Sequence, residues 1–284
     1  MGKLEPLVKW SGSKRSQAKS IVDRITRERR HYGTYIEPFC GGCSVLYYIL
    51  NTCPGYFDAF LCNDINAPLV HIYTAVKRDP ASLASTYRTL WKELNKDDNI
   101  ERKKSFFADV RDGFNKNHRP ELLFFIMRTT TNGMPRYNRN GDFNNSFHVT
   151  RNGMHPDRMS AVIDAWSELL NRYNVNFSTG SYNRVQPGPT DLMYLDPPYA
   201  HTKGMYYGSI DCDALYSYLR RIPCDYCMSF DGEVDGEDYF VCVPDDIYTE
   251  RYLLDSGVSS FRRIIGNGKI VNVKESLYCR FRTE

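Results

Sequence analysis

A glycine turn between two apolar strands is the feature that most restricts the fold of this 284-residue chain. A strand predicted over residues 34–39 runs into the Cys-Gly-Gly turn at 40–42, and an apolar helix over 44–50 follows. A second strand over 57–62 ends at the pair Asn-Asp at 63–64. This order of strand, glycine turn, helix and acid-terminated strand opens a doubly wound nucleotide-binding sheet, so we expect an α/β fold.

The alternation of strands and helices is interrupted in the middle of the chain. Apolar residues at helical spacing predict four helices there, over 83–94, 102–114, 121–128 and 156–173. The pair Asn140-Gly141, between Tyr137 and Phe143, predicts a β-hairpin in a polar segment. We therefore expect a sheet-forming domain from residues 1–79 and 174–284, split by a helical insertion at 80–173.

The other elements expected in the sheet-forming part flank this insertion. A basic helix over 16–30 precedes the first strand, and a further helix is expected over 68–76. After the insertion, we expect strands over 175–177, 191–195 and 226–230 and a helix over 213–221. A terminal antiparallel pair is expected over 259–265 and 276–281.

Charge is distributed unevenly although the net charge is only +3. Residues 1–30 carry nine Lys/Arg against three Asp/Glu, and residues 101–158 carry eleven against six. Residues 225–256 carry one against ten. This pattern fits one face that binds a polyanion and an acidic flank turned away from it, although charge alone favours ordinary solvated surface.

Composition argues against several classes of protein. No apolar run reaches the length of a membrane span and no signal peptide is recognisable, so a soluble cytoplasmic protein is expected. Nine cysteines, an odd number, do not suggest a disulfide framework. The two CxxC pairs, at 40–43 and 224–227, lie far apart, and the six histidines lack ligand spacing, so we predict reduced thiols and no metal.

The sharpest chemical motif is Asp196-Pro197-Pro198-Tyr199, at the end of an apolar strand. Open α/β sheets bind ligands at this edge, and two prolines leave carbonyl acceptors on a stiffened backbone. A carboxylate, a fixed carbonyl and an aromatic face suit a planar exocyclic amine, whose attack on a methyl donor develops positive charge. A capped turn after a strand is the structural alternative.

Three weaker motifs accompany it. Glu37-Pro38-Phe39 precedes the glycine turn, where a ligand can approach the backbone closely. Asp64 ends the next strand, where an acid can bind ribose hydroxyls or cap the following helix. The segment Lys-Trp-Ser-Gly-Ser-Lys at 9–14 lacks the spacing of a phosphate loop, which excludes an NTPase of that type.

Taken in order, these motifs resemble those of the Dam-type (D12 class) DNA adenine-N6 methyltransferases in their alpha-group arrangement, over roughly residues 7–200. The resemblance implies a Rossmann-like class I methyltransferase sheet, split by a helical target-recognition insertion with a hairpin. It also implies S-adenosylmethionine as methyl donor and a flipped adenine in double-stranded DNA as substrate. Cytosine-N4 or RNA-adenine methylation, or a catalytically silent DNA-binding protein on the same fold, are the alternatives.

The resemblance also implies roles for individual residues. Those expected to bind the donor are Trp10, Lys14, Phe39, Gly41, Gly42, Asp64 and Asp196. Those expected to hold the adenine are Asp196, Pro197, Pro198 and Tyr199. Those expected to contact DNA, around the family's Arg-x-Asn…Gly-x-Phe hairpin, are Met134, Arg136, Asn138, Arg139, Gly141 and Phe143. No metal is needed, because the donor itself supplies the electrophile.

Two departures from the family pattern stand out. The segment 179–182 lacks the acid that contacts the donor's adenine in many members, and the acidic continuation after residue 230 differs from the short Dam version. A cognate restriction endonuclease is a possible partner. The target sequence, for which GATC is a candidate, the oligomeric state and a bacterial or viral source stay open.

Overall fold

The computed structural model describes residues 5–27, 30–198, 210–234, 237–239, 243–258 and 272–282. Contacts within the chain divide it into two compact units. The first contains described residues 5–13 and 64–180, and the second contains residues 14–63, 181–198 and the described residues from 210 onward.

The second unit is built on a twisted sheet with parallel strands at its centre. Strands β2 (Phe57–Asp64), β1 (Tyr32–Glu37), β4 (Leu192–Leu195) and β5 (Asp225–Val234) lie in this order and run parallel. Strands β8 (Asn272–Arg280) and β7 (Glu250–Val258) continue the sheet antiparallel, and β6 (Glu237–Tyr239) also pairs with β5. The predicted α/β class is confirmed.

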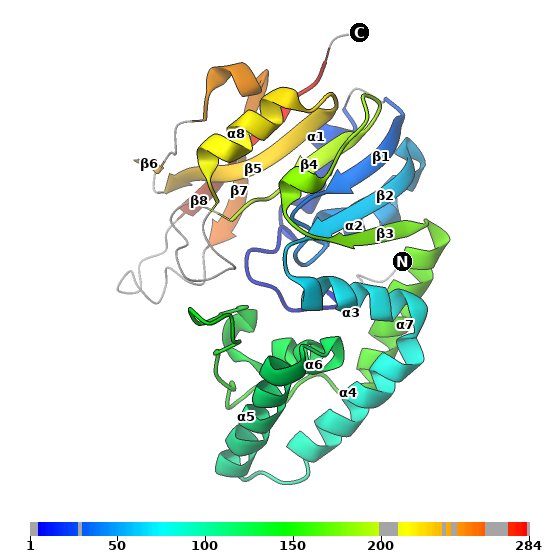
Figure 1. Ribbon diagram of the computed structural model, residues 1–284, viewed down its shortest axis with the longest axis vertical. Coiled ribbons are helices and arrows are strands. Elements are labelled where there is room, and N and C mark those ends of the chain that lie inside the picture. The colour runs from blue at the N-terminus through cyan, green and yellow to red at the C-terminus, as the bar shows by residue number, and fades with distance from the viewer. Residues whose placement is uncertain are drawn as a thin grey trace. The chain divides into compact units, whose positions relative to one another are not determined.

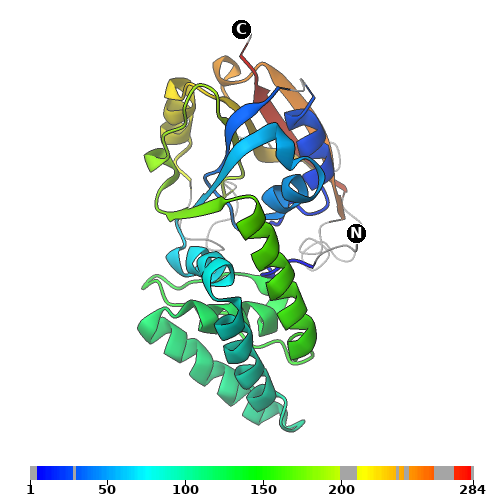
Figure 2. The same cartoon turned by 90° about the vertical axis from the view of Figure 1, so that its right-hand side faces the viewer.

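Helices cover both faces of this sheet. Helices α1 (Ala18–Ile25) and α2 (Ser44–Thr52) lie on one face, and α8 (Cys212–Arg221) lies on the other (Figure 1, Figure 2). All four residues of β4 are therefore buried, as a central strand covered on both faces requires. Around it, the core contains Ile36, Met193, Leu195, Leu219 and Phe230.

The helix predicted over 16–30 is shorter in the structure. Its apolar face consists of Ala18, Ile21, Val22 and Ile25, and the helix ends where that face ends. The Thr26 hydroxyl donates a hydrogen bond back to the Val22 carbonyl (2.9 Å) at this end. Arg27, which follows, is exposed and does not extend this buried face.

The antiparallel pair near the C-terminus differs from the prediction. Strand β8 pairs with β7, which precedes the predicted partner at 259–265 in the chain. Residues 259–265 lie outside the described residues. The acidic segment 225–256 contributes β5, β6 and β7, and one of its acids, Asp225, accepts hydrogen bonds from the Tyr32 hydroxyl (3.2 Å) and the Arg282 amide (2.8 Å).

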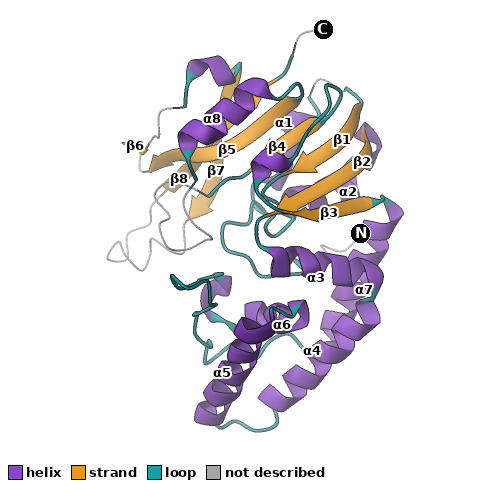
Figure 3. Ribbon diagram, in the orientation of Figure 1, coloured by secondary structure: helices purple, strands orange, loops and turns teal. Residues whose placement is uncertain are grey.

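The first unit is largely helical (Figure 3). It contains α3 (Ala67–Arg78), α4 (Pro80–Leu94), α5 (Ile100–Asn117), α6 (Pro120–Thr129), α7 (Pro156–Arg172) and the strand β3 (Val175–Thr179). Helix α6 forms its centre, because five consecutive apolar residues, 123–127, are all buried there. Prolines in the first turn and Asn or Asp side chains at the N-caps of α3 and α4 explain where these helices begin.

The N-terminal segment is held within this helical unit. The Trp166 indole donates to the Glu5 carbonyl (3.0 Å), and the buried Arg128 guanidinium donates to the Pro6 carbonyl (2.6 Å). Leu7 and Val8 are buried. No helix among the described residues is both long and apolar enough to cross a membrane.

Candidate active site

Asp196 and Lys14 lie far apart in the sequence, on either side of the helical insertion, but form an ion pair in the second unit. Asp196 directly follows β4, and the Lys14 Nζ lies 2.7 Å from its Oδ1. The Lys14 side chain is only 6% exposed, whereas Asp196 keeps 21% of its surface exposed. The carboxylate is therefore held in place from the protein side and can still be approached.

A third charged residue, Glu275 on β8, completes this group. Its Oε2 lies 3.6 Å from the Lys14 Nζ, and its side chain is 17% exposed. The ammonium thus lies between two carboxylates. No sequence motif pointed to Glu275, because only the pairing of β8 with β5, itself the neighbour of β4, brings it to this position.

Burial and charge both shift the pKa values of Asp196 and Lys14. Burial raises the pKa of Asp196 to about 6, against the opposing effect of the Lys14 ammonium, and Glu275 adds to the rise. Burial disfavours the charged form of Lys14, but the carboxylates of Asp196 and Glu275 outweigh it and raise the Lys14 pKa above its usual value. Lys14 is therefore a permanent cation at neutral pH, whereas Asp196 titrates close to it.

The rest of the predicted amine-binding motif is described only in part. Pro197 is buried and Pro198 is half-buried, and neither has a backbone N–H. Tyr199 lies outside the described residues.

The glycine turn after β1 is anchored by buried polar contacts. Gly41 and Cys43 have positive φ angles of 44° and 50°. Beneath the turn, the buried Glu37 carboxylate accepts hydrogen bonds from the Tyr35 hydroxyl and the Leu46 amide, both at 2.7 Å. Leu46 belongs to the first turn of α2, so Glu37 connects the end of β1 to the start of that helix and fixes the turn between them.

Three aromatic side chains of the second unit contact one another, beginning with Phe39 next to the glycine turn. The Phe39 ring lies 5.2 Å from the ring of Tyr182, which lies 5.4 Å from that of Tyr218. Phe39 was predicted to bind the donor, but Tyr182 was not singled out. It lies in the segment whose missing acid departs from the family pattern, and it supplies a half-buried aromatic face there.

Trp10 and Asp64 belong to the first unit. Trp10 is half-buried, and Asp64 is the last residue of β2. The Asp64 carboxylate accepts a hydrogen bond from the Asn66 amide (2.9 Å). The expected alternative role of Asp64 as the N-cap of the next helix is wrong, because the Asn66 side chain caps α3 by accepting from the Leu69 amide (3.1 Å).

The predicted hairpin is present in the first unit. Tyr137 and Phe143 form an antiparallel bridge, and Gly141, at φ +86°, closes the turn by donating to the Asn138 carbonyl (3.1 Å). The Asn138 side chain shapes the tip, because its oxygen accepts from the amides of Asn140 and Asp142, both at 2.9 Å.

The cationic side chains of this hairpin point outward. Arg136 and Arg139 are exposed, and neither guanidinium has a hydrogen bond or ion pair with the described part of the chain. Met134 is half-buried. Of the side chains expected to contact DNA, the two arginines are therefore free to do so, whereas Asn138 is engaged within the tip.

Two asparagines that no sequence motif indicated connect the hairpin to the helices by hydrogen bonds. Asn115 of α5 brackets the backbone of buried Phe143, donating to its carbonyl (3.0 Å) and accepting from its amide (2.8 Å). Asn66 donates to the Tyr137 hydroxyl (3.0 Å). The sequence around each asparagine does not predict its hydrogen bond, because Phe143 and Tyr137 lie far from them in the chain.

The N-terminal segment contacts the base of the hairpin. The Ser11 amide donates to the Gly133 carbonyl (3.1 Å), and Gly133 has a positive φ of 63°. A Cβ at this glycine would lie 3.0 Å from the Lys9 Cβ and 3.1 Å from the Lys9 carbonyl oxygen. Only glycine therefore allows this close approach.

We expect Gly133→Ala to lower both the stability of the first unit and DNA-dependent activity. The substitution combines a left-handed backbone, which costs about 1–2 kcal/mol for a non-glycine residue, with a clash against the Lys9 backbone. Gly141→Ala is the matched control, because Gly141 also has a positive φ but nothing lies within 4 Å of its Cβ position. Equal melting temperatures and activities for the two variants would show that the contact with Lys9 is unimportant.

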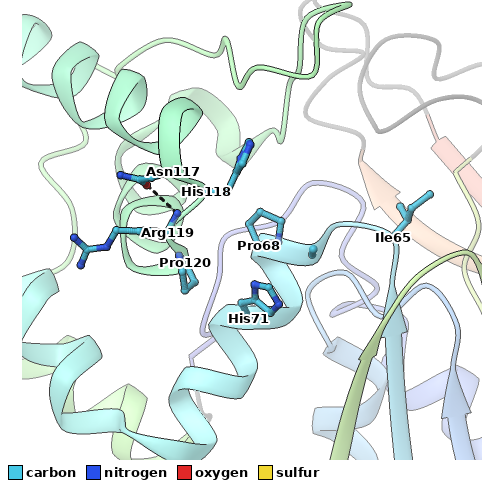
Figure 4. A pocket seen from close by; sticks show the side chains of 8 residues that line it. Ile65, Pro68, His71, Asn117, His118, Arg119 and Pro120 are labelled. Atoms are coloured by element: carbon cyan, nitrogen blue, oxygen red, sulfur yellow. Dashed lines mark hydrogen bonds between the residues drawn. The ribbon is translucent and has the colours of Figure 1, made fainter.

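One pocket in the first unit has no predicted site residue. It measures about 520 Å³ and is lined by Ile65, Ala67, Pro68, His71, Asn117, His118, Arg119 and Pro120. Figure 4 shows Pro68 and His71 of α3 on one side and His118, Arg119 and Pro120 on the other. Among these lining residues Arg119 is permanently charged, and its guanidinium is paired with Glu121 (3.4 Å).

No group of three or more His, Cys, Asp or Glu side chains that could hold a metal occurs in the part of the chain that the structure describes. In each of the two CxxC pairs, Cys40 with Cys43 and Cys224 with Cys227, both cysteines are buried and form no disulfide.

Comparison with known proteins identifies relatives over most of the chain. A family model described as D12 class N6 adenine-specific DNA methyltransferase matches residues 10–229. Type II methyltransferase M.MjaIII of Methanocaldococcus jannaschii is 31% identical over 207 residues, which cover 69% of each chain. The DNA adenine methylase of Serratia marcescens is 31% identical, and the match covers 70% of this chain and 68% of that protein. The DNA adenine methylase of Vibrio cholerae serotype O1 is 29% identical, and the match covers 70% of this chain and 67% of that protein.

Proposed function

Because this chain belongs to the D12 class of N6 adenine-specific DNA methyltransferases, we propose that it methylates a specific adenine in double-stranded DNA with S-adenosylmethionine as donor. The observation that carries the proposal is the Asp196 carboxylate at the end of β4, anchored by Lys14 at 2.7 Å and still partly exposed. In this proposal Asp196, Pro197, Pro198 and Tyr199 hold the exocyclic amine of the adenine.

The amine needs acceptors because its lone pair is delocalised into the base. Lys14 contacts Oδ1 of Asp196, and the second oxygen of that carboxylate, with the Pro197 carbonyl, is suited to accept the two amine hydrogens. These hydrogen bonds strengthen as the nitrogen becomes tetrahedral and positive, so they favour the transition state over the ground state. As the N–C bond forms, the bond between the methyl carbon and the donor sulfur breaks, and the sulfur leaves with that electron pair as a neutral thioether. The methylated amine then loses one proton, for which the Asp196 carboxylate is the nearest base in this scheme.

The amine of a paired adenine is inaccessible to such a site. Enzymes that do chemistry on a base rotate it out of the duplex, at the cost of unstacking. We therefore include base flipping in the proposal.

The residues around the glycine turn fit the methionine end of the donor. Gly41 and Gly42 add no side chain to the backbone after β1, and Phe39 and Tyr182 supply aromatic faces. Asp64, proposed to bind the ribose hydroxyls, and Trp10 belong to the first unit and are included because of the resemblance to the family. The donor, when bound, supplies a methyl group on a positively charged sulfur. We assign Lys14 to Asp196 rather than to the donor, because its ammonium is already in contact with that carboxylate.

The hairpin is the proposed DNA-contacting element. Arg136 and Arg139 are proposed to contact DNA directly, while Met134, Asn138 and Gly141 shape the surface that carries them. Arginine binds phosphates, which positions the duplex, and base edges, which specifies the sequence. The type II methyltransferases among the relatives make a cognate restriction endonuclease a proposed partner.

Product identification tests the proposed reaction. The protein is incubated with unmethylated duplex DNA and S-adenosylmethionine, and the nucleosides are analysed by mass spectrometry. We expect N6-methyldeoxyadenosine. N4-methyldeoxycytidine would show that the pocket takes the other exocyclic amine, and methylation of RNA alone would show that duplex DNA is the wrong substrate.

We expect Arg136→Ala to weaken DNA binding by about 1–3 kcal/mol if the arginine reads a base, with donor binding unchanged. If Arg136 contacts a phosphate instead, the loss of affinity is uniform across DNA sequences. The slope of log Kd against log salt concentration then decreases by about 1. Binding of target and non-target duplexes over a salt series separates these outcomes. Arg172→Ala, an exposed arginine of α7 outside the hairpin, is the control.

Lost donor binding with unchanged DNA affinity in Arg136→Ala, measured by calorimetry, would show that the hairpin does not belong to the DNA-contacting surface.

A further inference from the structure

Three buried charges meet where the proposed reaction takes place. The Lys14 ammonium donates a hydrogen bond to Asp196 at 2.7 Å and faces Glu275 at 3.6 Å. The nearer contact is a full hydrogen bond and the farther one is an ion pair without it. All three side chains are mostly buried, which makes their charges interact strongly.

Among the described residues, Lys14 is the charged partner of Glu275. The Glu275 Oε2 is buried and accepts no hydrogen bond from the described residues. A buried carboxylate oxygen without a hydrogen bond is costly and persists only beside a compensating charge. Lys14 supplies that charge, so Glu275 and Asp196 share one cation.

This sharing changes what Asp196 can offer to a substrate. A lysine paired with Asp196 alone would neutralise it and reduce its strength as an acceptor. With two carboxylates and one ammonium, the group keeps a net negative charge next to the amine that becomes positive during attack. The second carboxylate is therefore the source of the surplus negative charge.

We propose that Glu275 is a positioning residue for methyl transfer: it shares the Lys14 ammonium with Asp196 and so keeps Asp196 a strong acceptor for the substrate amine. The inference rests on the proposed function of Asp196. It assigns a role to a residue of β8 that lies beyond the region matched by the family model, residues 10–229.

The other groups that face Asp196 and Lys14 do not supply this charge. Glu37 on β1 is buried, and burial raises its pKa well above the usual value, which favours its neutral form. The hydroxyl of Tyr194 on β4 shares a hydrogen bond with Ser229 (2.8 Å). Among the described residues around the pair, Glu275 is the acid that contacts Lys14 besides Asp196.

The test is the pH dependence of the single-turnover methylation rate in Glu275→Gln. Asp196 must be ionised to accept the amine, so the rate of the parent enzyme rises with pH through about 6. Removing the neighbouring negative charge makes Asp196 less basic. In a plot of the single-turnover rate against pH, the acid limb is the part in which the rate rises with pH. We expect this limb to move to lower pH in Glu275→Gln, and the rate on the plateau above it to fall on the order of tenfold.

Two further variants make the result specific. Glu275→Asp keeps the charge and should restore the parental limb in large part, even if the shorter side chain lowers the rate. Glu250→Gln removes a carboxylate from the neighbouring strand β7, where it is 41% exposed, and should leave both limb and rate unchanged. Thermal unfolding of each variant shows whether it is folded.

The outcomes distinguish this inference from the proposed function. An unshifted limb and an unchanged rate in Glu275→Gln would overturn the inference. A raised KM for the donor with an unshifted limb would also overturn it, since Glu275 would then bind the donor. If Asp196→Asn retained full activity, the proposed role of Asp196 would fail first. A shifted limb in Glu275→Gln together with an inactive Asp196→Asn supports both.

Discussion

Asp196→Asn is expected to lower the single-turnover rate of methylation on the order of 10²–10³-fold, while the affinity for DNA stays close to that of the parent. The amide is nearly isosteric but carries no negative charge, and it offers one acceptor where the carboxylate offers two oxygens. The developing positive charge on the amine then lacks its counter-charge. Asp196→Ala, which removes both acceptors, is expected to abolish transfer.

The measurement combines rapid-quench methylation with DNA binding by fluorescence anisotropy. Asp213→Asn is the matched control, since Asp213 is an exposed acid in the first turn of α8, away from the ion pair. Retained DNA binding in Asp196→Asn shows that the loss concerns chemistry and not folding of the DNA-contacting unit. Equal product from Asp196→Asn and the parent would remove Asp196 from the mechanism.

The position of Asp196 was accessible from sequence for a simple physical reason. A short continuous apolar run that ends in Asp-Pro-Pro favours a buried strand that stops at the edge where open α/β sheets bind ligands. The structure places β4 at Leu192–Leu195, with Asp196 directly after it. The helix predicted over 121–128 is confirmed as α6, whose residues 123–127 are all buried.

What the sequence did not reveal are contacts between residues that lie far apart in the chain. Glu275 is brought to Lys14 by an antiparallel pairing at the end of the chain, and its own neighbours look like an ordinary strand. Asn115 brackets Phe143 from another element. Single polar residues of this kind have no local periodicity, so only the assembled fold identifies their partners.

Strand β7 was missed because its pattern is mixed. Its residues 250–258 include three charged side chains, and among the described ones Leu254 is buried whereas Leu253 is 43% exposed. Neither regular alternation nor a continuous apolar run marks such a strand. The pattern of the neighbouring segment 259–265 was closer to that of a strand. The sequence therefore predicted 259–265, and not β7, as the partner of the last strand.

Lys14→Met is expected to be the most destabilising single substitution in the second unit, lowering the free energy of unfolding by about 3–5 kcal/mol at neutral pH. It leaves two carboxylates, Asp196 and Glu275, facing each other without the ammonium that now lies between them. The substitution should also abolish methylation, because Asp196 loses the contact that orients it. Urea unfolding monitored by circular dichroism measures the first effect.

The pH dependence of this loss identifies its origin. Without Lys14, the pKa of Asp196 in the folded protein rises further above its unfolded value, so the carboxyl stabilises the fold only while it stays protonated. The deficit of Lys14→Met relative to the parent should therefore be small near pH 5 and grow as the pH rises toward 8. In the triple variant Lys14→Met/Asp196→Leu/Glu275→Leu, which removes all three buried charges, most of the deficit should disappear, because hydrophobic replacement of a complete buried ionic group costs little. A deficit that is independent of pH and persists in the triple variant would mean that Lys14 stabilises the fold by packing alone, and that its charge does not hold Asp196.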